Sequence, residues 1–186
     1  MSKLKVAVIF GGQSSEHEVS RLSATSVINN LSKEKYELFY VGITKEGRWL
    51  LYSGDVSDIA PGTWEHHPDN RPAFFSPDRG VGGLFVQDGN SFHIQPIDVI
   101  FPVLHGKNGE DGTIQGLFQL SGIPYVGCNT LSSSICMDKA ITNSLLEGMG
   151  IAQAHYLWFF IENYKTGAEK IKIKIAARLG YPVFVK

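Results

Sequence analysis

A continuous run of apolar residues, Lys5–Phe10, lies near the start of the chain and ends at Gly11 and Gly12. A strand that buries only one face alternates polar and apolar residues, and this run does not alternate. It is therefore typical of a central parallel strand that is buried on both faces. The run predicts an open, parallel-rich sheet with helices on both faces, which belongs to the α/β class of folds.

A helix and a second strand are predicted after the two glycines. Ser15 and Glu18 have the spacing of a capping box, which predicts that the helix starts there. Residues 36–43 predict the second strand, so the first 43 residues form a β-α-β unit. The apolar stripe of the helix comprises Ala24, Val27, Ile28 and Leu31.

The middle of the chain is less regular. Residues 44–96 predict an insertion of short antiparallel strands and loops on the edge of the sheet. Prolines interrupt this stretch, and Asp88-Gly89 lies between two apolar segments, which is the pattern of a β-hairpin. Residues 97–103 then predict another buried strand of the parallel sheet.

The loop after that strand is rich in glycine and in ionisable groups. His105 is followed by Gly106, which would let a ligand come close to the imidazole; the alternative is a histidine whose nitrogens are satisfied by the backbone. Glu110 and Asp111 are interpreted as loop-building and helix-start residues. Gln115, one turn into the next helix, is expected to face solvent.

The pattern after this helix predicts a short strand at 124–126 and one or two helical turns at 130–137. Asp138 is expected to cap a further helix.

The end of the chain predicts strands at 156–161 and 181–186. Residues 168–179 have helical spacing, although Lys170–Ile175 also alternates and leaves a strand open. Because an apolar strand stands last, we expect the chain to be the front part of a longer protein.

Candidate ligand-binding residues follow the parallel strands, where ligands bind in such sheets. The carboxylate of Glu16 could hold a substrate ammonium; the alternative is a favourable interaction with the positive end of the helix. His17 is expected to be a surface residue. Lys139 and Lys186 either extend along apolar surface or bind a polyphosphate.

Composition argues against several classes of partner. The net charge of −1 gives no basic surface for nucleic acid or for anionic lipid. No apolar run approaches the roughly 20 residues of a membrane span, and the protein is expected to be cytoplasmic. Cys128 and Cys136 are expected to be reduced, packed thiols rather than a disulfide or a metal site.

Three segments resemble the N-terminal part of D-alanine–D-alanine ligases, which are ATP-grasp enzymes of peptidoglycan precursor synthesis. The segments are residues 8–20 (VIFGGQSSEHEVS), 105–116 (HGKNGEDGTIQG) and 136–139 (CMDK). Residues 181–186 are similar to the strand that carries one of the family's ATP-contacting lysines. A nicotinamide-binding Rossmann domain is disfavoured, because the first glycines lack the G-x-G-x-x-G spacing.

The resemblance implies a Rossmann-like, pre-ATP-grasp domain at residues 1–137, which would bind substrate. Residues 138–186 would begin an ATP-grasp α+β domain, in which Lys139 and Lys186 would contact the nucleotide phosphates. The rest of that domain, with its metal ligands, is expected beyond Lys186. The resemblance further implies ATP and Mg²⁺ (or Mn²⁺) in the intact enzyme, a homodimer, and a part in cell-wall biogenesis and cell shape.

The implied reaction joins two D-alanines through a D-alanyl phosphate. Glu16 would bind the ammonium of the first D-alanine, Val19 would pack near its methyl group and Ser20 would support the site. His105 would lie beside the same substrate. Glu16 and His105 are the candidate catalytic residues under this resemblance.

Two alternatives to this function remain open. The intact protein could be a ligase that adds D-serine or D-lactate as the second substrate, as in glycopeptide resistance. The chain could also be a non-catalytic, truncated remnant. Because members of the family are considerably longer, we expect the 186-residue chain alone to be inactive.

Overall fold

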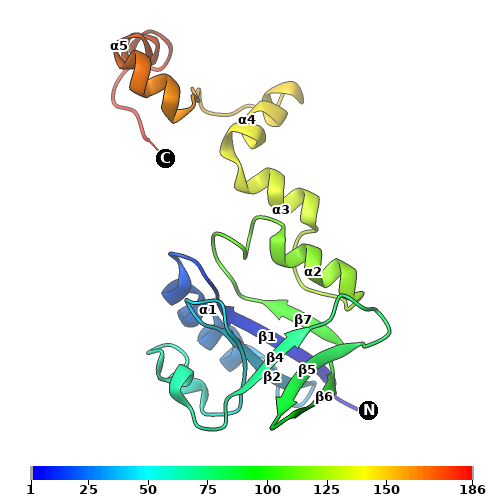
Figure 1. The fold of residues 1–186 in the computed structure, drawn as a ribbon. Helices are drawn as coiled ribbons and strands as arrows, with labels where there is room; N and C mark the ends of the chain where they lie inside the picture. The colour runs from blue at the N-terminus through cyan, green and yellow to red at the C-terminus, as the bar shows by residue number, and fades with distance from the viewer. Residues whose placement is uncertain (1, 186) are drawn as a thin grey trace. The chain divides into compact units, whose positions relative to one another are not determined.

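The structure of the chain is a computed structural model, which describes residues 2–185 (Figure 1). The predicted role of Lys186 therefore lies outside the described residues. Contacts divide the chain into two compact units, Met1–Met137 and Asp138–Lys186.

The first unit is built on a seven-stranded sheet with the order β6-β5-β4-β3-β2-β1-β7. Parallel pairing joins β1 to β2 and to β7, as the apolar run at Lys5–Phe10 predicts, and the remaining neighbours are antiparallel. The strands are β1 (Leu4–Gly11), β2 (Tyr36–Ile43), β3 (Trp49–Tyr52), β4 (Arg71–Phe75), β5 (Gly83–Asp88), β6 (Ser91–Pro96) and β7 (Val99–Pro102).

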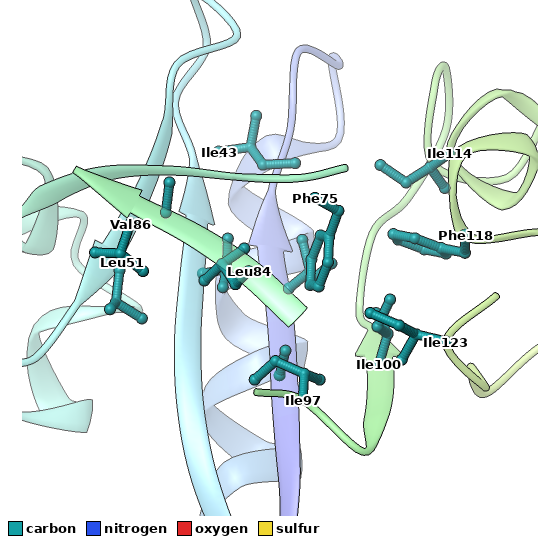
Figure 2. Packing of buried hydrophobic residues seen from close by; sticks show 14 of the residues in the cluster. Ile43, Leu51, Phe75, Leu84, Val86, Ile97, Ile100, Ile114, Phe118 and Ile123 are labelled. Carbon is teal, nitrogen blue, oxygen red and sulfur yellow. The ribbon is translucent and has the colours of Figure 1, made fainter. Parts of the chain in front are cut away.

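Helices pack on both faces of the parallel strands, which confirms the predicted α/β class. Val6, Val8 and Phe10 of β1 share a core with α1, whereas Ala7 and Ile9, which point the other way, share a core with α2 (Figure 2). The helical segments of this unit are α1 (His17–Asn30), the 3₁₀ turns η1 (Val56–Asp58) and η2 (Thr63–His66), α2 (Thr113–Ser121) and α3 (Thr130–Met137).

The antiparallel strands of residues 44–96 extend the sheet beyond β2 and curl over one of its faces. Leu84 and Val86 of β5 belong to the same core as Ala7 and Ile9 of β1, and Figure 2 shows β5 lying across the parallel strands. The β5–β6 hairpin closes at Gly89 and Asn90, between the paired residues Asp88 and Ser91. This part of the chain thus contributes to the main core.

The order in which strands are added to the sheet reverses between β1 and β7, which run parallel to each other. After β1 the chain forms α1 on one face and returns to β2, whereas after β7 it forms α2 on the opposite face. Tyr125 then bridges in parallel to Ile100, on the far side of β7. Open α/β sheets bind ligands beyond the carboxyl ends of the strands at such a switch point. The loops that follow Gly11 and Pro102 meet there.

The second unit contains two helices, α4 (Lys139–Gly148) and α5 (Ile161–Arg178), and Gly167 interrupts the helical backbone of α5. Asp138 caps α4 by accepting from the N–H groups of Ala140 and Ile141, as predicted.

The strands predicted at 156–161 and 181–186 are wrong within the described residues. Residues 151–160 have no regular structure, Ile161 begins α5, and residues 181–185 form turns and irregular backbone. Lys170–Ile175 lies inside α5, so the strand alternative is also wrong. An apolar run becomes a strand only when a neighbour pairs with its backbone, and residues 138–185 contain no strand.

Gly11 offers a test of the turn after β1. Its φ is +86°, and an added Cβ would lie 2.2 Å from the Ile43 carbonyl oxygen. We therefore expect Gly11→Ala to lower the free energy of unfolding by about 3 kcal/mol, from left-handed strain and overpacking together. Gly89→Ala is the control, because Gly89 has a φ of +58° with no atom within 4 Å of its added Cβ. Gly89→Ala should lower the free energy of unfolding by about 1 kcal/mol. Urea unfolding followed by circular dichroism measures both variants. Equal losses for Gly11→Ala and Gly89→Ala would contradict the role of the Ile43 contact.

Candidate functional site

Glu16 and His105 come together at the switch point, although they lie on different loops. Glu16 immediately precedes α1, and His105 follows β7. One ligand atom from each of Glu16, His105 and Glu110 lies within 4.8 Å of the others. The site therefore contains two carboxylates and one imidazole, of which Glu16 and Glu110 are exposed and His105 is half-buried.

The position of Glu16 depends on the backbone around it. Its N–H donates to Ser14 Oγ at 3.1 Å. Its carboxylate lies over Gly106, where an added Cβ would come within 3.2 Å of Glu16 Oε1 and 2.7 Å of Ser14 Oγ. Gly106 also has a φ of +70°. A glycine at this place therefore lets the two loops approach closely.

The capping box predicted for Ser15 and Glu18 is not formed. Helix α1 begins at His17 and has no side-chain cap, and Glu18 instead pairs with Lys45. The hydrogen bond from Lys45 lowers the pKa of Glu18 below its ordinary value. Glu16 occupies the N-cap position, but its side chain does not cap the helix.

Ser20 joins the ends of β1 and β7, the two strands that meet at the switch point. It is fully buried, accepts from the N–H of Gly11 at 2.8 Å, and donates to the carbonyl of Val103. Val19, its neighbour, is 48% exposed. Ser20 thus links the end of β1 to the residue that follows β7, while Val19 offers an accessible apolar group.

The loop that carries His105 is held by its own side chains. His105 Nε2 lies 3.2 Å from Ser23 Oγ, and its Nδ1 lies 3.8 Å from Glu110 Oε1. Glu110 Oε2 accepts from the N–H of Gly106 at 2.8 Å. Asp111 accepts from the N–H groups of Asn108 and Thr113. These contacts agree with the interpretation of both acids as loop-building residues.

Burial and hydrogen bonding act in opposite directions on Asp111. Burial raises the pKa of its carboxyl group, but the hydrogen bonds from the backbone of Asn108 and Thr113 lower it by more. The net pKa lies below the ordinary value of an aspartate, so the ionised form is favoured in the folded protein.

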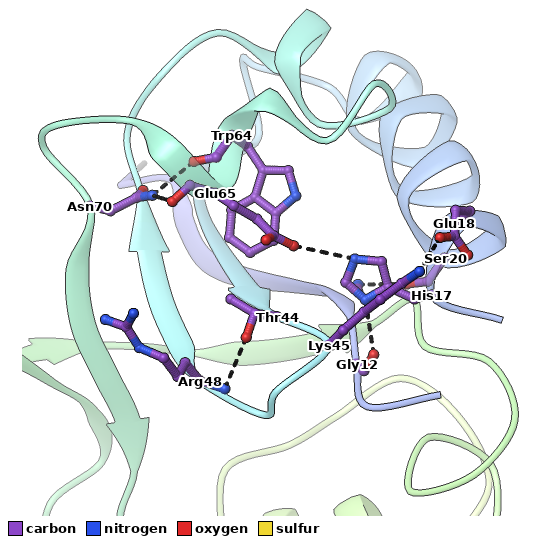
Figure 3. A network of polar contacts seen from close by, with 11 residues as sticks. Gly12, His17, Glu18, Ser20, Thr44, Lys45, Arg48, Trp64, Glu65 and Asn70 are labelled. Carbon is purple, nitrogen blue, oxygen red and sulfur yellow. Dashed lines mark hydrogen bonds and ion pairs between the residues drawn. The ribbon is translucent and has the colours of Figure 1, made fainter. Parts of the chain in front are cut away.

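Two residues that sequence reasoning left at the surface are buried. Gln115 is 7% exposed and donates from Nε2 to the Gly109 carbonyl at 2.8 Å, which anchors the His105 loop to α2. His17 is 1% exposed, and its Nδ1 lies 2.9 Å from the Gly12 carbonyl (Figure 3). The helical period could have shown both, because His17 has the spacing of Ala24 and Ile28, and Gln115 that of Phe118.

The two cysteines differ from the sequence-based expectation in one respect. Cys128 and Cys136 are both exposed rather than packed. They form no disulfide within residues 2–185.

A cavity of about 330 Å³ lies beside the His105 loop. Its lining includes Gly12 and Ile43 at the strand ends, Trp49, His105, and Ile114 and Leu117 of α2. The cavity adjoins the loop on the side of the sheet that α2 covers.

The donor set at the switch point fits an ammonium group better than a magnesium ion. Carboxylate oxygens accept the three N–H bonds of an ammonium, whereas Mg²⁺ prefers oxygen ligands alone and His105 would supply nitrogen.

Lys139, the first residue of α4, belongs to the second unit. Its predicted contact with nucleotide phosphates stays a prediction.

Comparison with known proteins identifies the family. Residues 5–128 match the family model described as "D-ala D-ala ligase N-terminus". The chain therefore belongs to this family.

No helix within residues 2–185 has both the length and the apolar character needed to cross a membrane.

Individual relatives match over the whole chain. The D-alanine–D-alanine ligases of Ruminiclostridium cellulolyticum and Caldicellulosiruptor bescii are each 50% identical over 100% of it, and the matches cover 51% and 50% of their lengths. The chain thus spans about half the length of these curated relatives.

Solved structures agree with these relatives. The VanG D-Ala:D-Ser ligase of Enterococcus faecalis is 41% identical, with a TM-score of 0.81 over 94% of this chain and 50% of that one. The D-alanine–D-alanine ligase of Coxiella burnetii is 31% identical, with a TM-score of 0.79 over 92% of this chain and 50% of that one.

Asp111 allows a test of the loop by pH. Because its pKa is depressed in the folded state, its stabilisation is complete above the unfolded pKa of about 3.9 and is lost as the pH falls through the folded pKa. We expect Asp111→Asn to lower the free energy of unfolding by about 1–2 kcal/mol at pH 7. The difference from the unmodified chain should shrink below about pH 4.

Urea unfolding at a series of pH values measures this difference. Asp69→Asn, at an exposed position, is the control and should change stability by less than about 0.5 kcal/mol. A loss at Asp111→Asn that stayed constant down to pH 2 would show that the charge of the carboxylate is not what holds the loop.

Proposed function

We propose that the chain is the substrate-binding half of a D-alanine–D-alanine ligase, and that it holds the first D-alanine at the switch point. The observation that carries this proposal is the meeting of Glu16 and His105 over Gly106, in a chain that is 50% identical to ligases of this name. An amino acid zwitterion needs a carboxylate for its ammonium, and Glu16 is an exposed carboxylate at the switch point, close to His105.

Each of the other candidate residues has a defined part in this proposal. Val19 offers an exposed apolar surface to the methyl group of D-alanine, and His105 lies beside the same substrate. Ser20 keeps the two strand ends together and so fixes the spacing of the loops. Orientation of the substrate is the main contribution that such a half-site makes to catalysis.

The chemistry is proposed for the intact protein. ATP would phosphorylate the carboxylate of the first D-alanine, and the amine of the second would attack the acyl phosphate and release phosphate. Lys139 and Lys186 would neutralise charge on the phosphates of the nucleotide, with Mg²⁺ or Mn²⁺ held by residues outside this chain. A cytoplasmic homodimer that serves peptidoglycan synthesis is part of the same proposal.

A second candidate function has one specific observation in its favour. The VanG ligase of Enterococcus faecalis, named for D-Ala:D-Ser ligation, has a TM-score of 0.81 to this chain. Both kinds of ligase would place D-alanine first, so the residues of this half do not separate them. The curated relatives at 50% identity favour D-alanine as the second substrate. Product analysis of the full-length protein with either acceptor would decide.

Binding of D-alanine to the 186-residue chain tests the first part of the proposal. Calorimetric titration should detect D-alanine binding that L-alanine does not reproduce. Glu16→Gln should weaken it by about tenfold or more, because a charge-assisted hydrogen bond is worth about 1.5–3 kcal/mol. Glu18→Gln is the matched control: Glu18 is exposed and pairs with Lys45, so its loss should leave the affinity unchanged. Equal effects of both substitutions would argue against Glu16 as the ammonium ligand.

A chimera tests the same residues during turnover. Residues 1–186 would be joined to the C-terminal half of the Ruminiclostridium cellulolyticum ligase, since the two chains align at 50% identity up to that point. The chimera should form D-alanyl-D-alanine. In it, Glu16→Gln should raise KM for the first D-alanine by about tenfold or more, whereas Glu18→Gln should not. A KM that Glu16→Gln leaves unchanged would remove the assigned role.

A further inference from the structure

His17 is a buried histidine next to the candidate ammonium ligand, and neither the proposed reaction nor the family resemblance gives it a task. The residue is 1% exposed, and its ring contacts polar atoms on two sides. Nδ1 lies 2.9 Å from the Gly12 carbonyl, and Nε2 lies 3.5 Å from Glu65 Oε1 (Figure 3). A buried, polar side chain with two such partners fixes the segments that it joins.

The first of these segments is the glycine turn that sets the start of α1. Gly12 donates its N–H to the Ile43 carbonyl at 2.8 Å, and its own carbonyl accepts from the N–H of Ser14 and from His17. An added Cβ on Gly11 would lie 3.1 Å from His17 Cε1, so the ring packs directly against the turn. His17 thereby pins a segment that glycine leaves conformationally free.

The second segment is η2, which belongs to the stretch between the parallel strands β2 and β7. Glu65 lies in η2, next to Trp64, which is fully buried against Phe10. Asn70 closes this turn by donating to the carbonyls of Trp64 and Glu65. The Glu65 carboxylate, which faces His17, therefore belongs to a segment whose neighbouring residue, Trp64, is packed in the core.

We propose that His17 is a positioning residue for Glu16, and that Glu65 holds its imidazole in place. Glu16 and His17 are consecutive at the start of α1, with His17 directed into the protein and the Glu16 carboxylate directed over Gly106. Fixing the ring against Gly12 and Glu65 fixes the direction in which the Glu16 carboxylate points. The contact with η2 thus links the inserted segment to the candidate ammonium site.

The chemistry of the ring gives a matched pair of variants. The Gly12 carbonyl only accepts, so Nδ1 carries a proton. Nε2 then forms an ion pair with the Glu65 carboxylate when it is protonated, or faces an amide N–H as an acceptor when it is not. Glu65→Gln supplies such an amide and keeps the contact, whereas Glu65→Ala removes it.

The importance of the geometry for D-alanine binding rests on the function proposed above, but the geometry itself is measured without ligand. In NMR spectra of the 186-residue chain, a nuclear Overhauser effect should connect the Glu16 side chain to the Hα protons of Gly106. His17→Ala should abolish it, Glu65→Ala should weaken it, and Glu65→Gln should retain it. If His17→Ala does not fold, the two Glu65 variants carry the same comparison.

Affinity for D-alanine gives the second readout. His17→Ala should weaken binding by about tenfold, Glu65→Ala by about threefold, and Glu65→Gln should bind like the unmodified chain. If the variants lost unfolding free energy while the Overhauser effect and the affinity stayed as in the unmodified chain, the role of His17 would be only structural and the proposal would be overturned. If the unmodified chain bound no D-alanine, the proposed function would fail, and the Overhauser effect would still decide the positioning role.

Discussion

The buried hydroxyl of Ser20 lies at the switch point and connects the ends of the two parallel strands from which the site loops begin. It accepts from the end of β1 and donates to Val103 just beyond β7, although these strands lie far apart in the sequence. A buried donor or acceptor without a partner costs free energy. The Ser20 hydroxyl provides a partner for both the Gly11 N–H and the Val103 carbonyl. Helices α1 and α2 leave the sheet on opposite faces at this junction, which is also where Glu16 and His105 come together.

The pattern of apolar residues correctly predicted the central parallel strands of the fold. The run at Lys5–Phe10 has no alternation because both of its faces are covered, and the second strand has the bounds 36–43 that the pattern indicated. The apolar runs at 156–161 and 181–185 led to wrong strand predictions. A strand also needs a neighbouring strand to pair with, and the sequence of one segment does not show whether such a neighbour exists. Local pattern therefore predicted strands correctly only where tertiary pairing supported them.

The sequence predicted which loops form the site, but it did not predict the side-chain contacts that hold those loops in place. Glycines beside ionisable groups at two strand ends pointed to Glu16 and His105, and the structure brings these two together. The capping box at Ser15 and Glu18 failed because Lys45, distant in sequence, competes for the same carboxylate. The two acids beside His17 suggested a surface position for it, and Gln115 was expected to face solvent. Their burial depends on the Gly12 and Gly109 carbonyls, which need partners.

The separation in sequence between β1 and β7 has a consequence for folding order. Lys5 of β1 bonds to Asp98, 93 positions later, and the strands inserted between β2 and β7 share the core with β1. Closing such a loop costs chain entropy before the contacts repay it, so long-range pairings of this kind form late. The meeting of Glu16 and His105 is then among the last features to assemble. The fraction of molecules with an intact site follows the cooperative stability of the whole unit, the antiparallel strands included.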